Sequence, residues 1–137
     1  MASYSAVCDS FKTDILQGVH QPGDVYMAAL YTSSASLSAA TTVYTNSGEV
    51  SGTGYTAGGQ ALSGFSVGIN GNVAYVTWSN ISWPASSLSG VVTLLIYNAT
   101  RSNKAVAVIT FPSITTTGGT LTIVFPTGMG AETITIN

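Results

Sequence analysis

The chain has 137 residues, of which three are Lys or Arg and five are Asp or Glu, so its formal net charge is −2. One domain of this size can bury a core without metal or disulfide support, and three fixed cations are too few for a phosphate-binding surface, which excludes nucleic-acid binding. No apolar run approaches the ~20 residues of a membrane-spanning helix. A surface with so little charge repels other copies weakly, which indicates a chain that works in an assembly.

The first residues predict the compartment. Met1 to Ser5 lack the basic start and the apolar stretch of a secretory signal. The single Cys8 has no partner for an internal disulfide, which agrees with a reducing compartment. We therefore expect synthesis in a cytoplasm.

Residues 1–24 differ from the rest of the chain because they hold four of its eight charged side chains. Asp9 or Ser10 can cap a short helix that runs through Gln17 and stops at Gly18. The apolar side of this helix would carry Phe11, Ile15 and Leu16. The alternative is an extended arm that lies on a neighbouring subunit. The segment is thus an arm or short helix ahead of a β domain over residues 25–137, within one globular unit.

The β portion begins with a strand over residues 25–32. Residues 41–44 fit either an edge strand or a loop. The glycine-rich segment 48–60 predicts a loop or a bulged edge strand whose backbone packs closely against another chain.

A hairpin follows the glycine-rich segment. Apolar residues alternate with other residues over 65–69 and again over 73–78, and Asn70-Gly71 between them is typical of a two-residue reversal. Pro84 cannot donate a ladder hydrogen bond, so we expect residues 81–84 to end the hairpin.

The second half of the chain holds the most continuous apolar runs. Three strands are predicted, over residues 91–97, 105–111 and 120–125, with Gly118-Gly119 at the second reversal. The first two runs are apolar at nearly every position, so both of their faces should be covered. With a final strand near Glu132, the seven or eight short strands predict an all-β fold, an antiparallel β-sandwich.

Candidate catalytic groups lack partners. His20 is the only histidine and Cys8 the only cysteine, and a metal site or an activated nucleophile needs more than one such group. We expect His20 to be a polar residue beside a turn and Cys8 to be a small buried hydrophobe. The glycines of residues 48–59 lack the following Lys-Ser or Lys-Thr, and the helix, of a phosphate loop.

Sugar chemistry is no better supported. Only Glu49 and Glu132 lie in the β portion, and nothing in the sequence brings these two carboxylates together. An aromatic platform for sugar is one interpretation of the aromatic residues, and a place in the core is the favoured one. The aromatic residues concerned are Tyr55, Tyr75, Trp78 and Trp83. The sequence therefore predicts no enzyme, no cofactor and no metal site.

Five segments of the chain form a recognisable set, namely Phe11-Lys12, Leu16 to His20, Met27 to Ala35, Glu49 to Gly59 and Leu95 to Asn98. In this order they resemble a family of small virion-associated proteins of tailed bacteriophages. The similarity extends from about Phe11 to Phe125, and its most specific piece is the glycine segment that starts at Glu49.

The resemblance implies a place in a virion, with synthesis in the host bacterial cytoplasm. The favoured role is that of a capsid decoration, or cement, protein, which binds the outside of the head shell and stabilises it, as a trimer. Its partners would be the major capsid protein and copies of itself. A neck, tail or fibre-base component is the first alternative, and a receptor- or glycan-binding module using Trp78 and Trp83 is the second.

The same resemblance suggests two contact regions. The shell would meet the first segment, through Phe11, Lys12, Ile15, Leu16 and His20. Subunits would meet at the glycine segment, through Glu49, Gly52, Gly54, Tyr55, Gly58 and Gly59.

Overall fold

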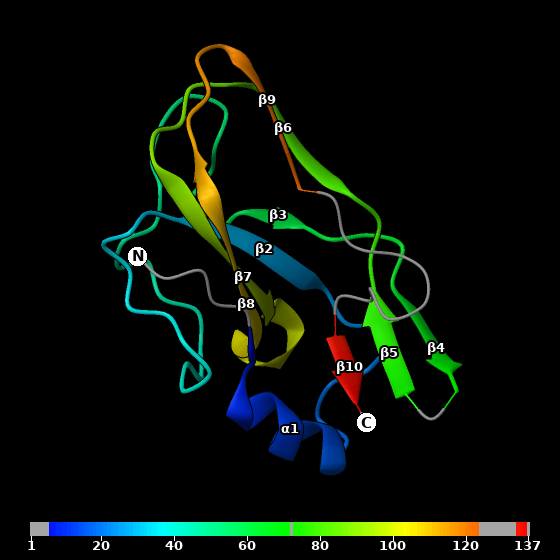
Figure 1. The fold of residues 1–137 in the computed structure, drawn as a ribbon. Coiled ribbons are helices and arrows are strands. Elements are labelled where there is room, and N and C mark those ends of the chain that lie inside the picture. The colour runs from blue at the N-terminus through cyan, green and yellow to red at the C-terminus, as the bar shows by residue number, and fades with distance from the viewer. Residues whose placement is uncertain (1–5, 72, 124–133, 137) are drawn as a thin grey trace.

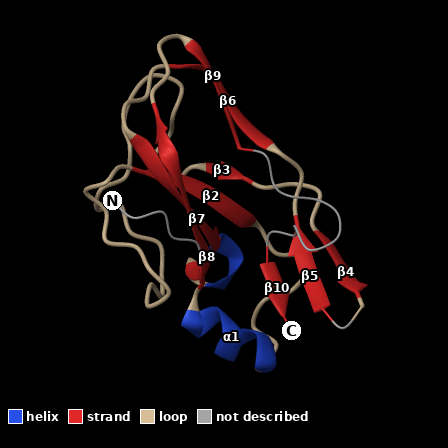
Figure 2. Ribbon diagram, in the orientation of Figure 1, coloured by secondary structure: helices blue, strands red, loops and turns tan. Residues whose placement is uncertain are grey.

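The computed structural model describes residues 6–71, 73–123 and 134–136 (Figure 1). In this part of the chain one short α-helix and one 3-10 turn accompany ten strands, which confirms the all-β fold with a short helix and divides it into more strands than the seven or eight expected (Figure 2). The elements are β1 (Ala6–Val7), α1 (Asp9–Leu16), β2 (Tyr26–Tyr31), β3 (Gln60–Ala61), β4 (Ser66–Asn70), β5 (Val73–Thr77), β6 (Ile81–Ser86), β7 (Val91–Asn98), η1 (Ala99–Arg101), β8 (Lys104–Ile114), β9 (Gly119–Ile123) and β10 (Ile134–Ile136).

The largest sheet has the strand order β1-β8-β7-β2-β3, and all of its pairs are antiparallel. Strand β7 lies in its middle, and nearly all of its residues are buried. The prediction that both faces of this apolar run are covered is therefore confirmed. The third predicted strand, over residues 120–125, corresponds to β9. It does not pair with β7 or β8, because it pairs with β6 in a separate two-stranded sheet.

The predicted hairpin is present as β4 and β5. Asn70 pairs with Val73, so the reversal begins after Asn70, one residue later than the Asn70-Gly71 predicted. Strand β10 pairs with the other edge of β5 and completes a three-stranded sheet of order β10-β5-β4. The final strand is thus confirmed over its described residues, while Glu132 lies outside them.

The prediction that residues 81–84 end the hairpin is wrong, since β6 is a strand of its own that runs through Pro84. Trp83 pairs with Leu121 and Ser86 pairs with Gly119, so the register shifts between them. A bulge of this kind tolerates the missing N–H of proline.

One continuous core joins the sheets. The ring of Tyr26 on β2 lies 5.5 Å from that of Phe65 and 5.6 Å from that of Trp78, centroid to centroid, which attaches the β4–β5 hairpin to the large sheet. Trp83 of β6 is also buried. Both tryptophans therefore contribute to the core, as favoured. The side chain of Tyr75 lies outside the described residues.

Candidate functional site

Helix α1 begins after Cys8, and neither of the predicted caps makes a capping bond. The backbone N–H of Asp9 instead donates to the carbonyl of Ala39 at 2.8 Å, so a loop satisfies the first helical amide. The helix ends as predicted, since Gly18 adopts a φ of +72°. Cys8 is buried, as expected, and burial raises the pKa of its thiol to about 11.

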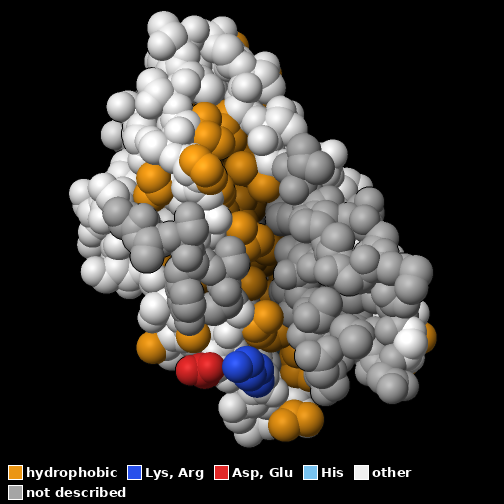
Figure 3. Space-filling model, in the orientation of Figure 1, with side chains coloured by type: hydrophobic (Ala, Val, Ile, Leu, Met, Phe, Trp, Pro, Cys, Tyr) orange, Lys and Arg blue, Asp and Glu red, His pale blue; other side chains and the backbone are white. Residues whose placement is uncertain are grey.

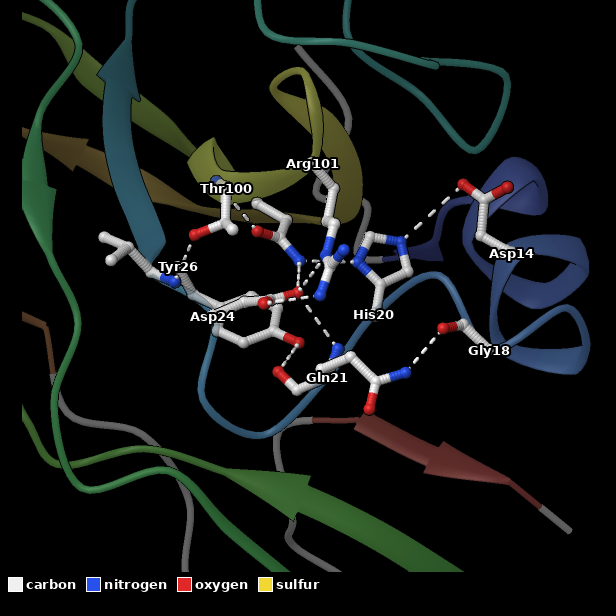
Figure 4. A network of polar contacts seen from close by, with 10 residues as sticks. Asp14, Gly18, His20, Gln21, Asp24, Tyr26, Thr100 and Arg101 are labelled. Carbon is white, nitrogen blue, oxygen red and sulfur yellow. Dashed lines mark hydrogen bonds and ion pairs between the residues drawn. The ribbon is translucent and has the colours of Figure 1, made fainter.

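Asp24 fastens the turn after the helix to the far end of β7 (Figure 4). Its Oδ2 accepts from Arg101 Nε at 2.8 Å and from Asn98 Nδ2 at 2.8 Å, and its Oδ1 accepts from Arg101 Nη2 at 3.1 Å. The backbone N–H of Gln21 donates to the same carboxylate. The hydrogen bonds from Arg101, above all, lower the pKa of Asp24 to about 2. The carboxylate is thus held charged, and its oxygens accept hydrogen bonds that join the turn to β7 and η1.

His20 lies beside this network with a side chain only 3% exposed. Asn98 Nδ2 already donates to Asp24 and its Oδ1 accepts from the N–H of Thr100, so the amide orientation is set and Nδ1 of His20 is the acceptor at 3.0 Å. The neutral ring then carries its proton on Nε2, which faces Asp14 Oδ2 at 3.6 Å, beyond hydrogen-bonding distance. Desolvation lowers the pKa of His20, and the carboxylate of Asp14 offsets part of that effect.

An apolar cavity of about 170 Å³ lies between α1 and the β4–β5 hairpin. His20, Tyr26 and Trp78 are the members of its described lining that carry polar atoms, and Val67 both lines it and is 60% exposed. The lining residues are Phe11, Ile15, His20, Pro22, Tyr26, Phe65, Val67, Val76, Trp78 and Val106. Among the described residues, the lining holds no serine, cysteine or carboxylate, so the cavity offers a mainly apolar surface.

The structure brings together three of the five residues predicted to contact a shell. Phe11, Ile15 and His20 meet at the cavity, but Phe11 and the imidazole of His20 are buried within the chain's own core. The other two lie outside: Leu16 is 89% exposed, and Lys12 forms an exposed 3.3 Å ion pair with Asp9.

Glu49 anchors the glycine segment. Its carboxylate accepts from Tyr44 Oη at 2.6 Å, from the backbone N–H of Gly58 at 2.7 Å, and from Tyr55 Oη. Tyr55 Oη in turn accepts from the backbone N–H of Leu30 in β2 at 3.0 Å. Burial and these contacts with Glu49 raise the pKa of Tyr55 far above its ordinary value. The segment is therefore fixed to the large sheet.

The glycines of this segment meet the chain's own backbone. Gly59 has a φ of +83°, and a Cβ there would overlap the carbonyl oxygen of Ala28 in β2. Gly52 and Gly54 similarly abut the backbone of Ser87 and Ser86 and remain exposed on their other side. The close approach of this segment is thus made within the chain, and its contact with another subunit stays a prediction.

Two features of the site escaped the sequence analysis. The partners Asp24 and Arg101 lie far apart in the chain, and no local pattern joins them. The sequence also did not predict that the aliphatic side chains of β4 are exposed, because apolar and small residues alternate in the same way in any half-buried strand.

The residues that the structure describes contain no group of three His, Cys, Asp or Glu side chains able to hold a metal ion. In the same residues, no helix has the length and apolar character of a membrane span. No protein-family model, no curated protein and no solved structure matches the chain.

Proposed function

We propose that this protein is a structural component of a tailed-bacteriophage particle that binds the outside of the head shell as a decoration, or cement, protein. The resemblance of its segments to virion-associated proteins supports a place in a phage particle. The observation that carries the proposal in the structure is the nearly neutral surface, in which exposed aliphatic side chains outnumber exposed ion pairs. On the face drawn in Figure 3, the visible charged side chains form one acidic and one basic spot, side by side near α1 and next to a band of hydrophobic side chains.

The outer side of α1 is the surface we assign to the shell. Leu16 is the most exposed large hydrophobic residue of the described chain, and Lys12 lies one turn before it. Burying a leucine side chain contributes about 2 kcal/mol, so a lattice of copies that each insert one would gain considerable adhesion. The buried Phe11 and His20 contribute indirectly, because they hold α1 against the large sheet.

Such binding would stabilise the shell by mass action, since the protein would bind only the assembled lattice. The partners in this proposal are the major capsid protein and further copies of the chain, arranged as a trimer. The protein would be made in the bacterial cytoplasm and function in the virion.

The first test is stoichiometry in purified particles. A ratio near one to one with the shell protein supports decoration, whereas a handful of copies assigns the protein to the neck, tail or fibre base. Absence from the particle would refute both structural roles.

The second test is a point substitution, because deleting residues 2–20 would remove β1 and the core residue Phe11. We expect Leu16→Lys to weaken binding to undecorated shells about tenfold, the loss of about 1.4 kcal/mol. Val43→Lys, at a half-exposed position outside α1, on the loop bridged to Lys104, is the matched control. Equal, full occupancy by both variants would show that α1 does not face the shell.

A further inference from the structure

Strand β4 has a free edge. It pairs with β5 on one side, and no described strand pairs with its other side. Figure 1 shows β4 as the outermost strand on its side of the molecule. The edge of such a strand presents a row of N–H and C=O groups that can accept another strand.

This edge lacks the usual protection. Proteins guard exposed edges with charges, prolines or bulges, and β4, with the sequence Ser-Val-Gly-Ile-Asn, contains none of them in its continuous pairing with β5. The whole stretch from Val50 to Thr100 contains no charged residue. By contrast, β6 carries Pro84 and a register shift. Neither electrostatic repulsion nor backbone geometry therefore keeps a second strand away from β4.

Two aliphatic side chains stand beside the free edge. Val67 is 60% exposed and Ile69 is 71% exposed. They lie two residues apart on one strand, so both point to the same face of the sheet. Most of the other large aliphatic residues of the sheets are buried. Val67 and Ile69 are therefore an exposed apolar pair that a second molecule could cover.

We propose that β4 pairs antiparallel with β4 of a second copy, about a two-fold axis through Gly68. In this register Val67 lies opposite Ile69 of the second copy, and Ile69 opposite Val67, so two aliphatic cross-strand pairs form at once. The contact is isologous, since each strand offers the other the same donors and acceptors. The two three-stranded sheets become one six-stranded sheet of order β10-β5-β4-β4-β5-β10.

A second copy is the occupant because the strand complements itself. The central Gly68 lets the two backbones meet at the axis, and the two aliphatic residues on either side of it meet the same spacing on the second copy. The neutral net character of this half of the chain removes the like-charge penalty that a contact between identical surfaces normally carries.

The register is tested by cysteine cross-linking of the full chain. In the double variant Val67→Cys/Ile69→Cys, each new thiol faces its counterpart on the second copy at a separation that suits a disulfide. We expect mild oxidation to give covalent dimers on a non-reducing gel. The single variants should cross-link far less, because identical residues of the two copies then stand diagonally. The unmodified chain, with its buried Cys8, gives the background. Equal cross-linking of single and double variants, or none in the double variant, would overturn the register.

The contact itself is tested by analytical ultracentrifugation over a concentration series. We expect Ile69→Lys to raise the dissociation constant of the two-fold contact by at least about tenfold, whereas Leu16→Lys leaves it unchanged. A monomeric unmodified chain, or an assembly that Ile69→Lys does not weaken, would refute the pairing. The inference depends on the fold alone, so its failure would leave shell binding through α1 unaffected, and shell binding could fail without affecting it.

Discussion

The glycine segment over residues 48–59 and the β4–β5 hairpin are neighbours in the chain and nearly uncharged, yet the structure treats them differently. The first is fixed inward: Glu49 collects donors from two tyrosines, and Gly59 touches the backbone of β2. The second leaves a strand edge and two aliphatic side chains open. A glycine-rich segment can therefore mark close packing inside a chain, while a plain alternating strand forms the open surface.

The difference has a simple physical basis. Glycine allows two backbones to approach because it has no Cβ, and Gly54 and Gly59 use this freedom against the backbones of β6 and β2. Gly68 has the same property, but it lies on an edge strand that pairs with β5 on one side and with no described strand on the other. Whether a glycine serves the fold or an interface thus depends on what lies opposite it.

The sharpest test of the inward packing is Gly59→Ala. The added methyl group would overlap Ala28 and would also occupy a left-handed φ, so we expect a loss of about 4 kcal/mol in the free energy of unfolding, measured by denaturant titration. Gly58→Ala is the matched control, since its φ of +95° is strained in the same way but its Cβ would only touch Tyr97 Oη. Equal losses for the two variants would mean that the contact with β2 contributes nothing.

Tyr55→Phe tests the polar anchor of the same segment. It removes a donor to Glu49 and leaves the buried N–H of Leu30 without an acceptor, so we expect a loss of about 2 kcal/mol. Thermal unfolding followed by circular dichroism would measure it. A neutral result would indicate that the segment is held by its glycines alone.

Asp24→Asn extends the comparison to the other fastened segment, residues 18–24. The carboxylate has a pKa of about 2 in the folded protein and 3.8 ordinarily, so its contribution is complete above about pH 4 and is lost as the pH falls through 2. We expect a loss of about 1 kcal/mol at pH 7, because solvent screens the half-exposed Arg101.

Acid titration of unfolding should show this difference disappear towards pH 2. Asp9→Asn, in an exposed ion pair, is the control and should change stability by less than about 0.5 kcal/mol at pH 7. A difference for Asp24→Asn that grew on acidification would contradict the assigned sign.

The smallest effect is expected at the open strand. Ile69→Lys should change the free energy of unfolding of the separated chain by less than about 0.5 kcal/mol, because the side chain is largely exposed. Measurement at high dilution separates this effect from assembly. A loss of several kcal/mol would show that Ile69 packs in the core, and β4 would then not differ from the glycine segment around Gly59.

Local patterns in the sequence predicted most of the strands. Runs such as residues 91–97 and the alternation of residues 65–69 identified β7 and the β4–β5 hairpin because side-chain periodicity is a local property. Pairings between distant segments were not predictable in this way. The bulge at Pro84, the amide of Asp9 bonded to Ala39, and the union of Asp24 with Arg101 each depend on a partner that only the folded chain brings near.

The internal pairing of the charges has one further consequence, which concerns ionic strength. Asp24 is paired with Arg101, Asp9 with Lys12, and Glu49 is enclosed by tyrosines. Salt screens only fields that reach the solvent. Contacts made by strand edges and aliphatic side chains keep their strength from dilute buffer to brine, and strongly excluded salts such as sulfate reinforce them. The pairing of two copies through β4 that we propose would therefore depend little on ionic strength.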